Sequence, residues 1–447
     1  MSKKLPELLF IAVCLLLALT LSAGFLLFGP APAGANERLT APPKLVSGED
    51  GALNESVLSE LSAYYSDHFF LRQELITARN ALSALLGTSG TADVIVGSEG
   101  WLYYAPTLPD YTGAAPMSAG ELFSAVRNLW LMQEYCESRG AKFLFTAAPN
   151  KNSLYPAHMP DYGAAAETHD AQRLYTLLEA QGVSYADLFL AFGARDEVLY
   201  FAHDSHWNSR GAALAVDVLN GAFGRESSYF SQRFTTGNAH QGDLFEMLYP
   251  AAADRETDLI PENAPRYVRE GKETRPDSIT IRTDGEGSGS LLCFRDSFGN
   301  LLYPYLADSF DRALFSRAAA YDLRQIDATE ADFVLVELVE RNLRDLTTEV
   351  PVMPAPARRL ALPEGSTGAV ALARETPARA PEGCVLLRGE YPAARDAASP
   401  VYVLCADGAY EAFTLADGFA AYLPADAEPV GIACLVNGAL ACFSAAK

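Results

Sequence analysis

Three short and mostly apolar runs constrain the fold of this chain more than any other feature. They are KFLFTAA at 142–148, SLLCF at 290–294 and ADFVLVEL at 331–338. Strands that are apolar at consecutive positions are buried on both faces, as in parallel sheets covered by helices. Segments with helical spacing separate these runs. The sequence therefore predicts an α/β fold, with a mainly parallel sheet between two layers of helices.

Capping and glycine signals set the bounds of the predicted helices. Ser118 and Glu121 form a capping box for a helix that ends near Gly140, and a second helix, about 168–181, stops at Gly182. The other predicted elements are helical segments over 54–86, a strand–turn–strand unit over 93–104, strands at 199–201 and 278–282, a helix from Asn208 or Ser209 to about 222, and a helix that begins near Ser297.

The N-terminal segment is apolar enough to cross a membrane. Lys3 and Lys4 precede a stretch from Leu8 to Phe28 that is longer than the core of a usual signal peptide. The lysines favour a cytoplasmic N-terminus, which places the remainder outside the membrane. We therefore expect a retained anchor. A secreted chain, cleaved at Ala33-Gly34-Ala35, is the alternative, and it too exports the remainder.

Composition divides the chain into five expected parts. Pro, Ala and Gly are enriched in 30–50, and six prolines lie in 350–382, which is typical of linkers. Beyond Cys384, short apolar runs alternate with hairpin signals such as Asp407-Gly408, which predicts a small β-sandwich. The expected parts are a transmembrane anchor or signal at 1–29, a linker at 30–50, an α/β domain at 51–349, a Pro-rich linker at 350–382 and a small β domain at 383–447.

Charge and cysteine usage exclude some classes of function. The formal net charge of −22 disfavours a nucleic-acid partner. The seven cysteines have no zinc-binding spacing, and we expect neither a metal nor a cofactor. If Asn437-Gly438 forms a two-residue turn, Cys434 faces Ala441 and not Cys442, because successive strand positions alternate faces. A disulfide between these two cysteines is therefore not expected.

The segment HDSHWN, residues 203–208, carries one half of a candidate catalytic site. It lies between a predicted strand and a predicted helix, where α/β sheets place their active sites. Asp204 can accept the Nδ1–H of His206, which leaves Nε2 as a base, and Trp207 can line the site or stack on a sugar. Two other interpretations stay open: a helix-entry loop capped by Asp204, and a metal site of His203, Asp204 and His206.

The segment RDSF, residues 295–298, carries the other half. Ser297 exposes its hydroxyl on a sharp turn, and the N–H groups of Ser297 and Phe298 lack helical partners, so they can stabilise an oxyanion. The alternative is that Asp296 or Ser297 only caps the helix. Because the carboxyl ends of parallel strands meet at one crevice, this loop and the Asp204–His206 pair can converge.

These segments resemble those of the alginate O-acetyltransferase family (AlgJ and AlgX) and of the related DHHW-type proteins. The supporting segments are Asp67-His68-Phe69 with Arg72, Gly97 to Leu102, Pro149-Asn150-Lys151 with Tyr155-Pro156, Gly242-Asp243-Leu244 and Glu340-Arg341. The resemblance covers about residues 55–345. It implies an SGNH-hydrolase-like fold with permuted catalytic order, in which the Asp-His segment precedes the serine.

The resemblance also implies roles and a reaction. Asp204 would orient His206, His206 would activate Ser297, and Ser297 would carry an acetyl group. The serine follows Arg295-Asp296 where ordinary SGNH enzymes have Gly-Asp, so a second oxyanion donor is unassigned and Asn150 is the candidate. The candidate substrate contacts are Trp207, Lys151, Tyr155 and Arg341, with structural roles as the alternative.

The implied activity is extracytoplasmic O-acetylation of a cell-surface or extracellular polysaccharide, through an acetyl-serine intermediate. A membrane-bound O-acyltransferase partner would pass on the acetyl donor. If water replaces the sugar hydroxyl, the same residues make an acetylesterase. A non-catalytic polysaccharide-binding or assembly protein is the alternative from another class.

Overall fold

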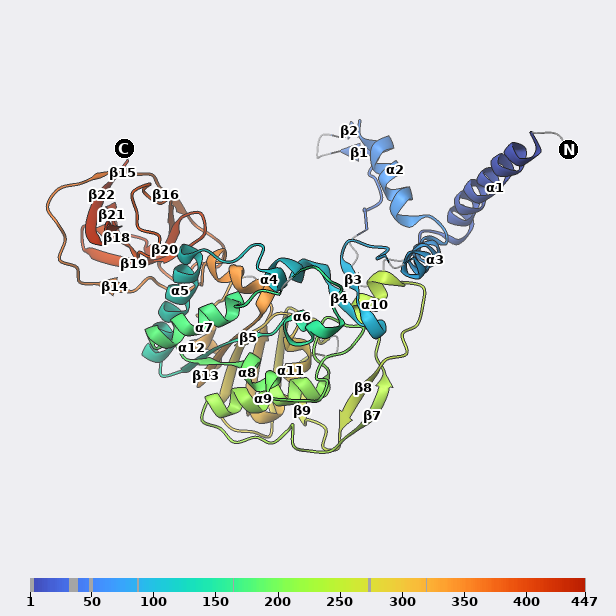
Figure 1. The fold of residues 1–447 in the computed structure, drawn as a ribbon. Coiled ribbons are helices and arrows are strands. Elements are labelled where there is room, and N and C mark those ends of the chain that lie inside the picture. The colour runs from blue at the N-terminus through green and yellow to red at the C-terminus, as the bar shows by residue number, and fades with distance from the viewer. Residues whose placement is uncertain are drawn as a thin grey trace.

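The computed structural model describes residues 4–31, 39–47, 51–86, 88–163, 165–271, 275–318 and 320–446. The expected signal cleavage site at 33–35 lies outside these residues. Within them, helix α1 (Leu5–Phe28) is the only helix that is long and apolar enough to cross a membrane. Figure 1 shows that α1 projects away from the body of the molecule. The segments that follow it are β1 (Val46–Ser47), β2 (Ala52–Leu53), α2 (Val57–His68) and α3 (Arg72–Leu85).

A seven-stranded sheet, counted over the described residues, forms the middle layer of the α/β domain. In spatial order its strands are β6 (Tyr185–Ala186), β5 (Lys142–Ala148), β13 (Phe333–Val339), β11 (Ser290–Phe294), β12 (Arg312–Ser316), β10 (Thr280–Gly285) and β9 (Tyr267–Arg269). Neighbouring pairs from β6 to β12 are parallel, whereas β10 pairs antiparallel with both β12 and β9. The mainly parallel sheet is confirmed, although the strand expected at 278–282 runs in the opposite direction.

Helices cover both faces of this sheet, as Figure 1 shows. On one face lie α5 (Ala119–Ser138), α7 (Asp170–Gln181) and α12 (Gln325–Thr329), and on the other lie α8 (Leu188–Gly193), α9 (Ser209–Ala222) and α11 (Gly299–Ser309). Alternate residues of one strand enter the two cores: Phe143 and Phe145 pack with α5, and Leu144 packs with α9. This is the three-layer architecture expected from strands that are apolar on both faces.

The ends of the helices follow their sequence signals. Ser118 and Glu121 form the expected capping box at α5, and Gly182 ends α7 at φ +70°, a left-handed conformation that glycine adopts without strain. Asn208 caps α9 as expected. Smaller elements complete the domain: β3 (Val94–Val96) with β4 (Leu102–Tyr104), α4 (Leu108–Thr112), α6 (Lys151–Leu154), β7 (Phe234–Ala239) with β8 (Thr257–Pro261), α10 (Asp243–Leu248) and the 3₁₀ segment η4 (Glu340–Thr347).

Two expected elements differ from the structure. The segment 199–201 forms no strand of the sheet; it makes one isolated bridge, between Tyr200 and Trp207. The helix expected to begin near Ser297 begins at Gly299. At 199–201 the backbone bonds to His206, Asn208 and the Tyr155 hydroxyl, and at the start of the helix Asp296 Oδ1 takes the Phe298 N–H.

The C-terminal region is the expected strand-rich unit. Its strands are β14 (Ala357–Arg358), β15 (Gly368–Val370), β16 (Leu372–Glu375), β17 (Cys384–Gly389), β18 (Val401–Cys405), β19 (Gly408–Thr414), β20 (Phe419–Pro424), β21 (Pro429–Val436) and β22 (Ala439–Ala445). Strand β19 pairs with β18 along its first part and with β20 at its end, so the sheet folds over its own core. Cys434 faces Ala441, which confirms the register predicted from Asn437-Gly438.

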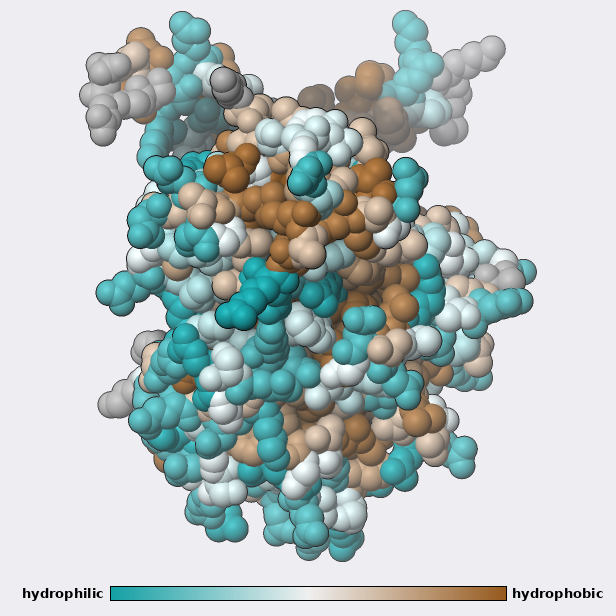
Figure 2. Space-filling model, turned by 90° about the vertical axis from the view of Figure 1, so that its left-hand side faces the viewer, coloured by the Kyte–Doolittle hydropathy of each residue, from teal (hydrophilic) through white to brown (hydrophobic). Residues whose placement is uncertain are grey.

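The segment 350–382, expected to be a linker, is not an open tether. It contains β14, β15 and β16, each paired with a strand of the C-terminal sheet. The sheet also packs against α5, where the fully buried Glu411 carboxylate binds Arg127 and Arg358 at 2.6 and 2.7 Å. The C-terminal sheet thus shares buried contacts with the α/β domain. On the face shown in Figure 2, hydrophobic residues gather in the upper half.

Candidate active site

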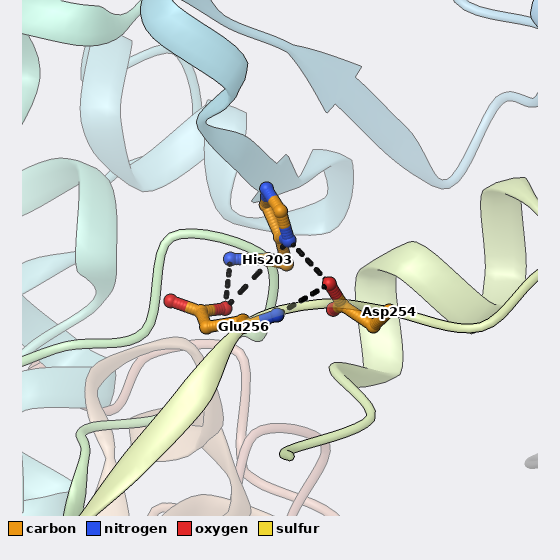
Figure 3. Close-up of side chains that lie close together, drawn as sticks. All are labelled: His203, Asp254 and Glu256. Carbon is orange, nitrogen blue, oxygen red and sulfur yellow. Dashed lines mark hydrogen bonds and ion pairs between the residues drawn. The ribbon is translucent and has the colours of Figure 1, made fainter. Parts of the chain in front are cut away.

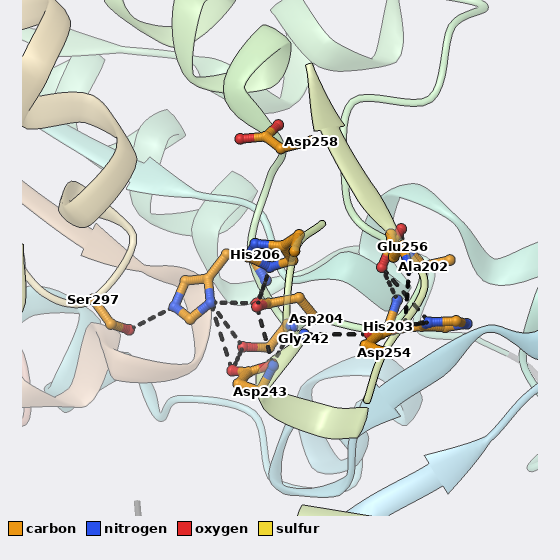
Figure 4. A network of polar contacts seen from close by, with 12 residues as sticks. Ala202, His203, Asp204, His206, Gly242, Asp243, Asp254, Glu256, Asp258 and Ser297 are labelled. Carbon is orange, nitrogen blue, oxygen red and sulfur yellow. Dashed lines mark hydrogen bonds and ion pairs between the residues drawn. The ribbon is translucent and has the colours of Figure 1, made fainter. Parts of the chain in front are cut away.

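Two loops at the carboxyl end of the sheet form the candidate site. One loop runs from residue 202 to 208 and enters α9, and the other, 295–298, joins β11 to α11. They approach each other although they are far apart in the sequence (Figure 4). Their side chains include Asp204, His206 and Ser297.

These three side chains form a continuous hydrogen-bonded chain. The His206 Nε2 atom lies 2.9 Å from the Ser297 Oγ, and its Nδ1 lies 2.6 Å from Asp204 Oδ1. The backbone N–H of His206 also donates to Asp204 Oδ1, at 2.9 Å. A proton on Nδ1 leaves Nε2 able to accept the hydroxyl proton of Ser297, which is the arrangement that general-base activation of a serine needs.

Burial and charge act against each other on the imidazole and the carboxyl. Burial lowers the pKa of His206, but the adjacent Asp204 carboxylate and the charge of Asp243 outweigh it, so the pKa is raised above its usual value. Burial raises the pKa of Asp204, but its contacts with His206 and His240 hold it well below its usual range. The carboxylate therefore stays charged at a pH where the imidazole changes its protonation state.

A second segment, which includes residues 240–243, supports the Asp204 carboxylate. His240 Nε2 lies 2.9 Å from Asp204 Oδ2, and the backbone N–H of Asp243 donates to the same oxygen at 3.1 Å. The Asp243 carboxylate in turn accepts the N–H and hydroxyl of Ser205, at 2.7 and 2.6 Å. Sequence reasoning missed His240; the only signal near it was the Gly242-Asp243-Leu244 segment.

The loop that carries Ser297 is fixed by Asp296. Asp296 Oδ1 accepts the N–H of Phe298 at 2.9 Å, and Oδ2 accepts Val339 N at 2.8 Å and Asn342 Nδ2 at 2.9 Å. The expectation that the Phe298 N–H is free is therefore wrong, because Asp296 occupies it. Within the described residues no hydrogen bond uses the Ser297 N–H, which leaves it as the available oxyanion donor of this loop.

Asn150 lies in a different set of contacts. It is buried, its N–H donates to Glu340 Oε2 at 2.9 Å, and its Nδ2 lies 3.2 Å from Asp110 Oδ2. No hydrogen bond joins Asn150 to Ser297 among the described residues. Its role as an oxyanion donor stays a prediction.

Three expected substrate contacts have structural partners. Trp207 is fully buried against Phe298 and other rings, so it cannot stack on a sugar. Lys151 is buried, and its Nζ donates to the carbonyls of Ala202 and Asp204 at 2.7 and 2.9 Å, which holds the His-Asp loop. The hydroxyl of Tyr155 accepts the Leu199 N–H at 2.8 Å. These contacts correct the expected roles of Trp207 and Lys151 and give Tyr155 a structural one.

Arg341 remains available for a ligand. Its guanidinium lies 5.5 Å from the ring centre of Phe298 and 5.3 Å from that of Tyr104. The side chain is half-buried, and no ion pair to it exists among the described residues. A cation beside the residue that follows Ser297 can attract negative charge at the site.

The expected alternative of a metal site on His203, Asp204 and His206 does not match the geometry. His203 turns to Asp254 and Glu256 (Figure 3), whereas the other two lie with Asp243. Within each group the ligand atoms lie within 4.8 Å of one another, so each could hold a cation. In the first group the oxygens already accept N–H donors, including His203 Nδ1 at 2.8 Å from Asp254 Oδ1.

Known proteins are similar to part of this chain. Residues 94–285 match the family described as SGNH hydrolase-like domain, acetyltransferase AlgX, a range that includes Asp204 and His206 and ends before Ser297. The "Probable alginate O-acetylase AlgJ" of Pseudomonas aeruginosa is 27% identical over 207 residues, which are 44% of this chain and 51% of that protein. The chain thus spans about half the length of this relative.

Two solved structures are similar to part of this chain. PatB1 from Bacillus cereus, solved with a sulfonyl adduct, has a TM-score of 0.46 and 15% identity, covering 57% of this chain and 96% of that one. A DHHW family protein from Eubacterium siraeum has a TM-score of 0.43 and 15% identity, covering 59% and 97%. The family match over residues 94–285 and the AlgJ relative confirm the resemblance predicted from the short motifs.

Proposed function

Because this chain carries an SGNH hydrolase-like domain similar to that of the acetyltransferase AlgX, we propose that it O-acetylates a polysaccharide outside the cytoplasm. The observation that carries the proposal is the contact of His206 Nε2 with Ser297 Oγ at 2.9 Å, with Asp204 on the other ring nitrogen. A fold of this kind is compatible with several reactions, so the proposal depends on the contacts among Ser297, His206 and Asp204 and on their chemistry.

The first half of the reaction forms an acetyl-serine. His206 Nε2 takes the proton of Ser297 as Oγ attacks the carbonyl carbon of an acetyl ester. The Ser297 N–H stabilises the oxyanion, and the Arg341 cation adds to the positive potential. The bond to the leaving oxygen then breaks, and that oxygen takes the proton from His206. Asp204 stabilises the imidazolium between these steps.

The second half transfers the acetyl group to a sugar. A glycan hydroxyl gives its proton to His206 and attacks the acetyl carbon, and Ser297 leaves with the proton from His206. Water at the same position would give an acetylesterase. The half-buried Ser297 and a His206 side chain that is 19% exposed support a site that an acceptor can reach.

Helix α1 supports a location at the outer face of a membrane. Its 24 residues span about 36 Å as a helix, enough for a hydrocarbon core of about 30 Å. Its last turns pack against the segment that joins α2 to α3: the Phe28 ring stacks on Phe70 at 5.1 Å, and the only buried residue of α1, Gly24, lies under the same ring. Such packing supports a retained anchor. A membrane-bound O-acyltransferase would then supply the acetyl donor from the same membrane.

The test uses the full chain in detergent micelles, with p-nitrophenyl acetate as donor and with or without an acetyl-free glycan. The wild type should release nitrophenol, and acetylated glycan should appear when acceptor is present. Ser297→Ala and His206→Phe should lose both reactions. Ser205→Ala is the matched control, because Ser205 Oγ lies 3.3 Å from the same imidazole but at Nδ1.

The outcomes separate the candidate functions. Nitrophenol release without acetylated glycan indicates an esterase. If Ser297→Ala and wild type act at equal rates while Ser205→Ala is inactive, the wrong serine has been assigned. If the wild type forms neither nitrophenol nor acetylated glycan, a non-catalytic role in polysaccharide binding replaces the enzyme.

A further inference from the structure

The Asp204 carboxylate is shared between two imidazoles. Oδ1 faces His206 (Figure 4), and Oδ2 lies 2.9 Å from His240 Nε2. The carboxyl side chain is 8% exposed, so its charge depends on these donors. Each oxygen also accepts one backbone N–H, from His206 and from Asp243. The plane of the carboxylate is thereby fixed from both sides.

The ring of His240 is itself held in place. It stacks on Phe201 with 3.8 Å between ring centres and 6° between planes, and the backbone N–H of His240 donates to the Glu256 carbonyl at 2.7 Å. Donation to the charged Asp204 requires a proton on Nε2. The ring therefore presents one N–H to Oδ2 in a fixed direction.

We infer that His240 is a positioning residue, which holds the second oxygen of Asp204 and so aims the His206 base at Ser297. This inference rests on the proposed function of the Ser297 site. His240 does not touch the reacting atoms; it acts through Asp204. Without it, Oδ2 would keep one backbone donor, and the orientation of the carboxylate toward His206 Nδ1 would be less well defined.

His240 also competes with His206 for the charge of Asp204. The groups that face His240 are Asp204 across its Nε2, with Asp258 and Glu256 near its ring. Burial lowers the pKa of His240, but Asp204 and these two acids outweigh it, so the pKa is raised. A hydrogen-bond donor or a cation at Oδ2 weakens the electrostatic stabilisation that the carboxylate gives to protonated His206. Removal of His240 should therefore raise the pKa of His206, so that the base becomes active at higher pH.

The experiment measures the pH dependence of p-nitrophenyl acetate turnover by the full chain. His240→Phe keeps the stacked ring and removes the N–H, while His240→Gln keeps an N–H donor without charge. His158→Phe is the matched control: His158 is 24% exposed, against 26% for His240, and it stacks on Trp101 at 4.5 Å and 5°.

We expect His240→Phe to lower kcat by about tenfold, the rate equivalent of a lost hydrogen bond to a charged group, with little change in KM. The acid limb of the pH–rate profile of His240→Phe should move to higher pH by about one unit. His240→Gln should recover most of kcat, and His158→Phe should match the wild type in both readouts.

The inference is overturned if His240→Phe keeps the wild-type kcat and acid limb. It is also overturned if His240→Phe and His240→Gln lose activity equally without a shift of the limb, since that pattern indicates only a loss of packing. The proposed function fails separately, if Ser297→Ala retains turnover.

Discussion

Lys151 provides a test of how the His-Asp loop is held. Its Nζ donates to the carbonyls of Ala202 and Asp204 and lies 5.1 Å from the ring centre of Trp101. A neutral amine has two N–H donors, which match the two carbonyls. Burial lowers the pKa of Lys151 from an ordinary 10.5 to about 7, against the charges of Asp204, Glu256 and Asp243. We predict the effect of Lys151→Met on stability across this range.

The magnitude follows from the two pKa values. At a pH between the folded and unfolded pKa values of Lys151, the unfolded chain holds a proton on this side chain that the folded chain has released. The free energy of unfolding of the wild type therefore increases with pH in this range. The gain is about 1.4 kcal/mol per pH unit, or about 3 kcal/mol between about pH 6 and pH 9. Lys151→Met lacks this titration and loses two hydrogen bonds at every pH, at a cost of about 2–3 kcal/mol.

The assay is denaturant unfolding of the full-length wild type and Lys151→Met in the same detergent. Their difference in free energy of unfolding cancels the other titrating groups. We expect this difference to move by about 3 kcal/mol in favour of the wild type from about pH 6 to pH 9. A difference that stays constant within about 0.5 kcal/mol would show that Lys151 keeps its proton, and would refute the account of this loop.

Three further changes test other parts of the account. Asp204→Asn should lower kcat by roughly 10³–10⁴-fold in the ester assay, because the amide no longer stabilises the imidazolium of His206; a loss below about tenfold would contradict this role. Gly242→Ala should lower the stability by about 1–3 kcal/mol in thermal unfolding, because a Cβ there would lie 2.4 Å from the His203 carbonyl oxygen. Unchanged stability would show that the backbones of Gly242 and His203 can move apart freely. Glu411→Ala should cost about 3 kcal/mol in denaturant unfolding, because it leaves two arginines without their fully buried partner; an unchanged midpoint would mean that this contact does not join the sheet to α5.

The sequence predicted the layers of the fold because local signals and burial agree there. The runs at 142–148 and 290–294 are the strands β5 and β11 with the expected bounds, since a strand buried on both faces must be apolar throughout. The cap at Ser118 and the left-handed stop at Gly182 are local features, and they too were predictable. The direction of a strand was harder to predict, because nothing within 278–282 indicates that this segment pairs antiparallel with its neighbours.

The site was predictable only in part, because its details depend on contacts between distant segments. The Asp204–His206 spacing is local, but the approach of Ser297 depends on the whole sheet. Trp207 was expected to line the site or to stack on a sugar, and it is in the core, since a ring next to this loop can face inwards as readily as outwards. The partner of Asp204 at His240 lies 36 residues away, and no local pattern connects the two.

The most direct measurement of the central claim is the mass of the protein after exposure to an acetyl donor without acceptor. We predict one added acetyl group, located by fragmentation on Ser297, which disappears when an acceptor glycan is added and does not form in Ser297→Ala. Glycan acetylation by Ser297→Ala at the wild-type rate, or an acetyl group that forms elsewhere and turns over with the glycan, would contradict the account.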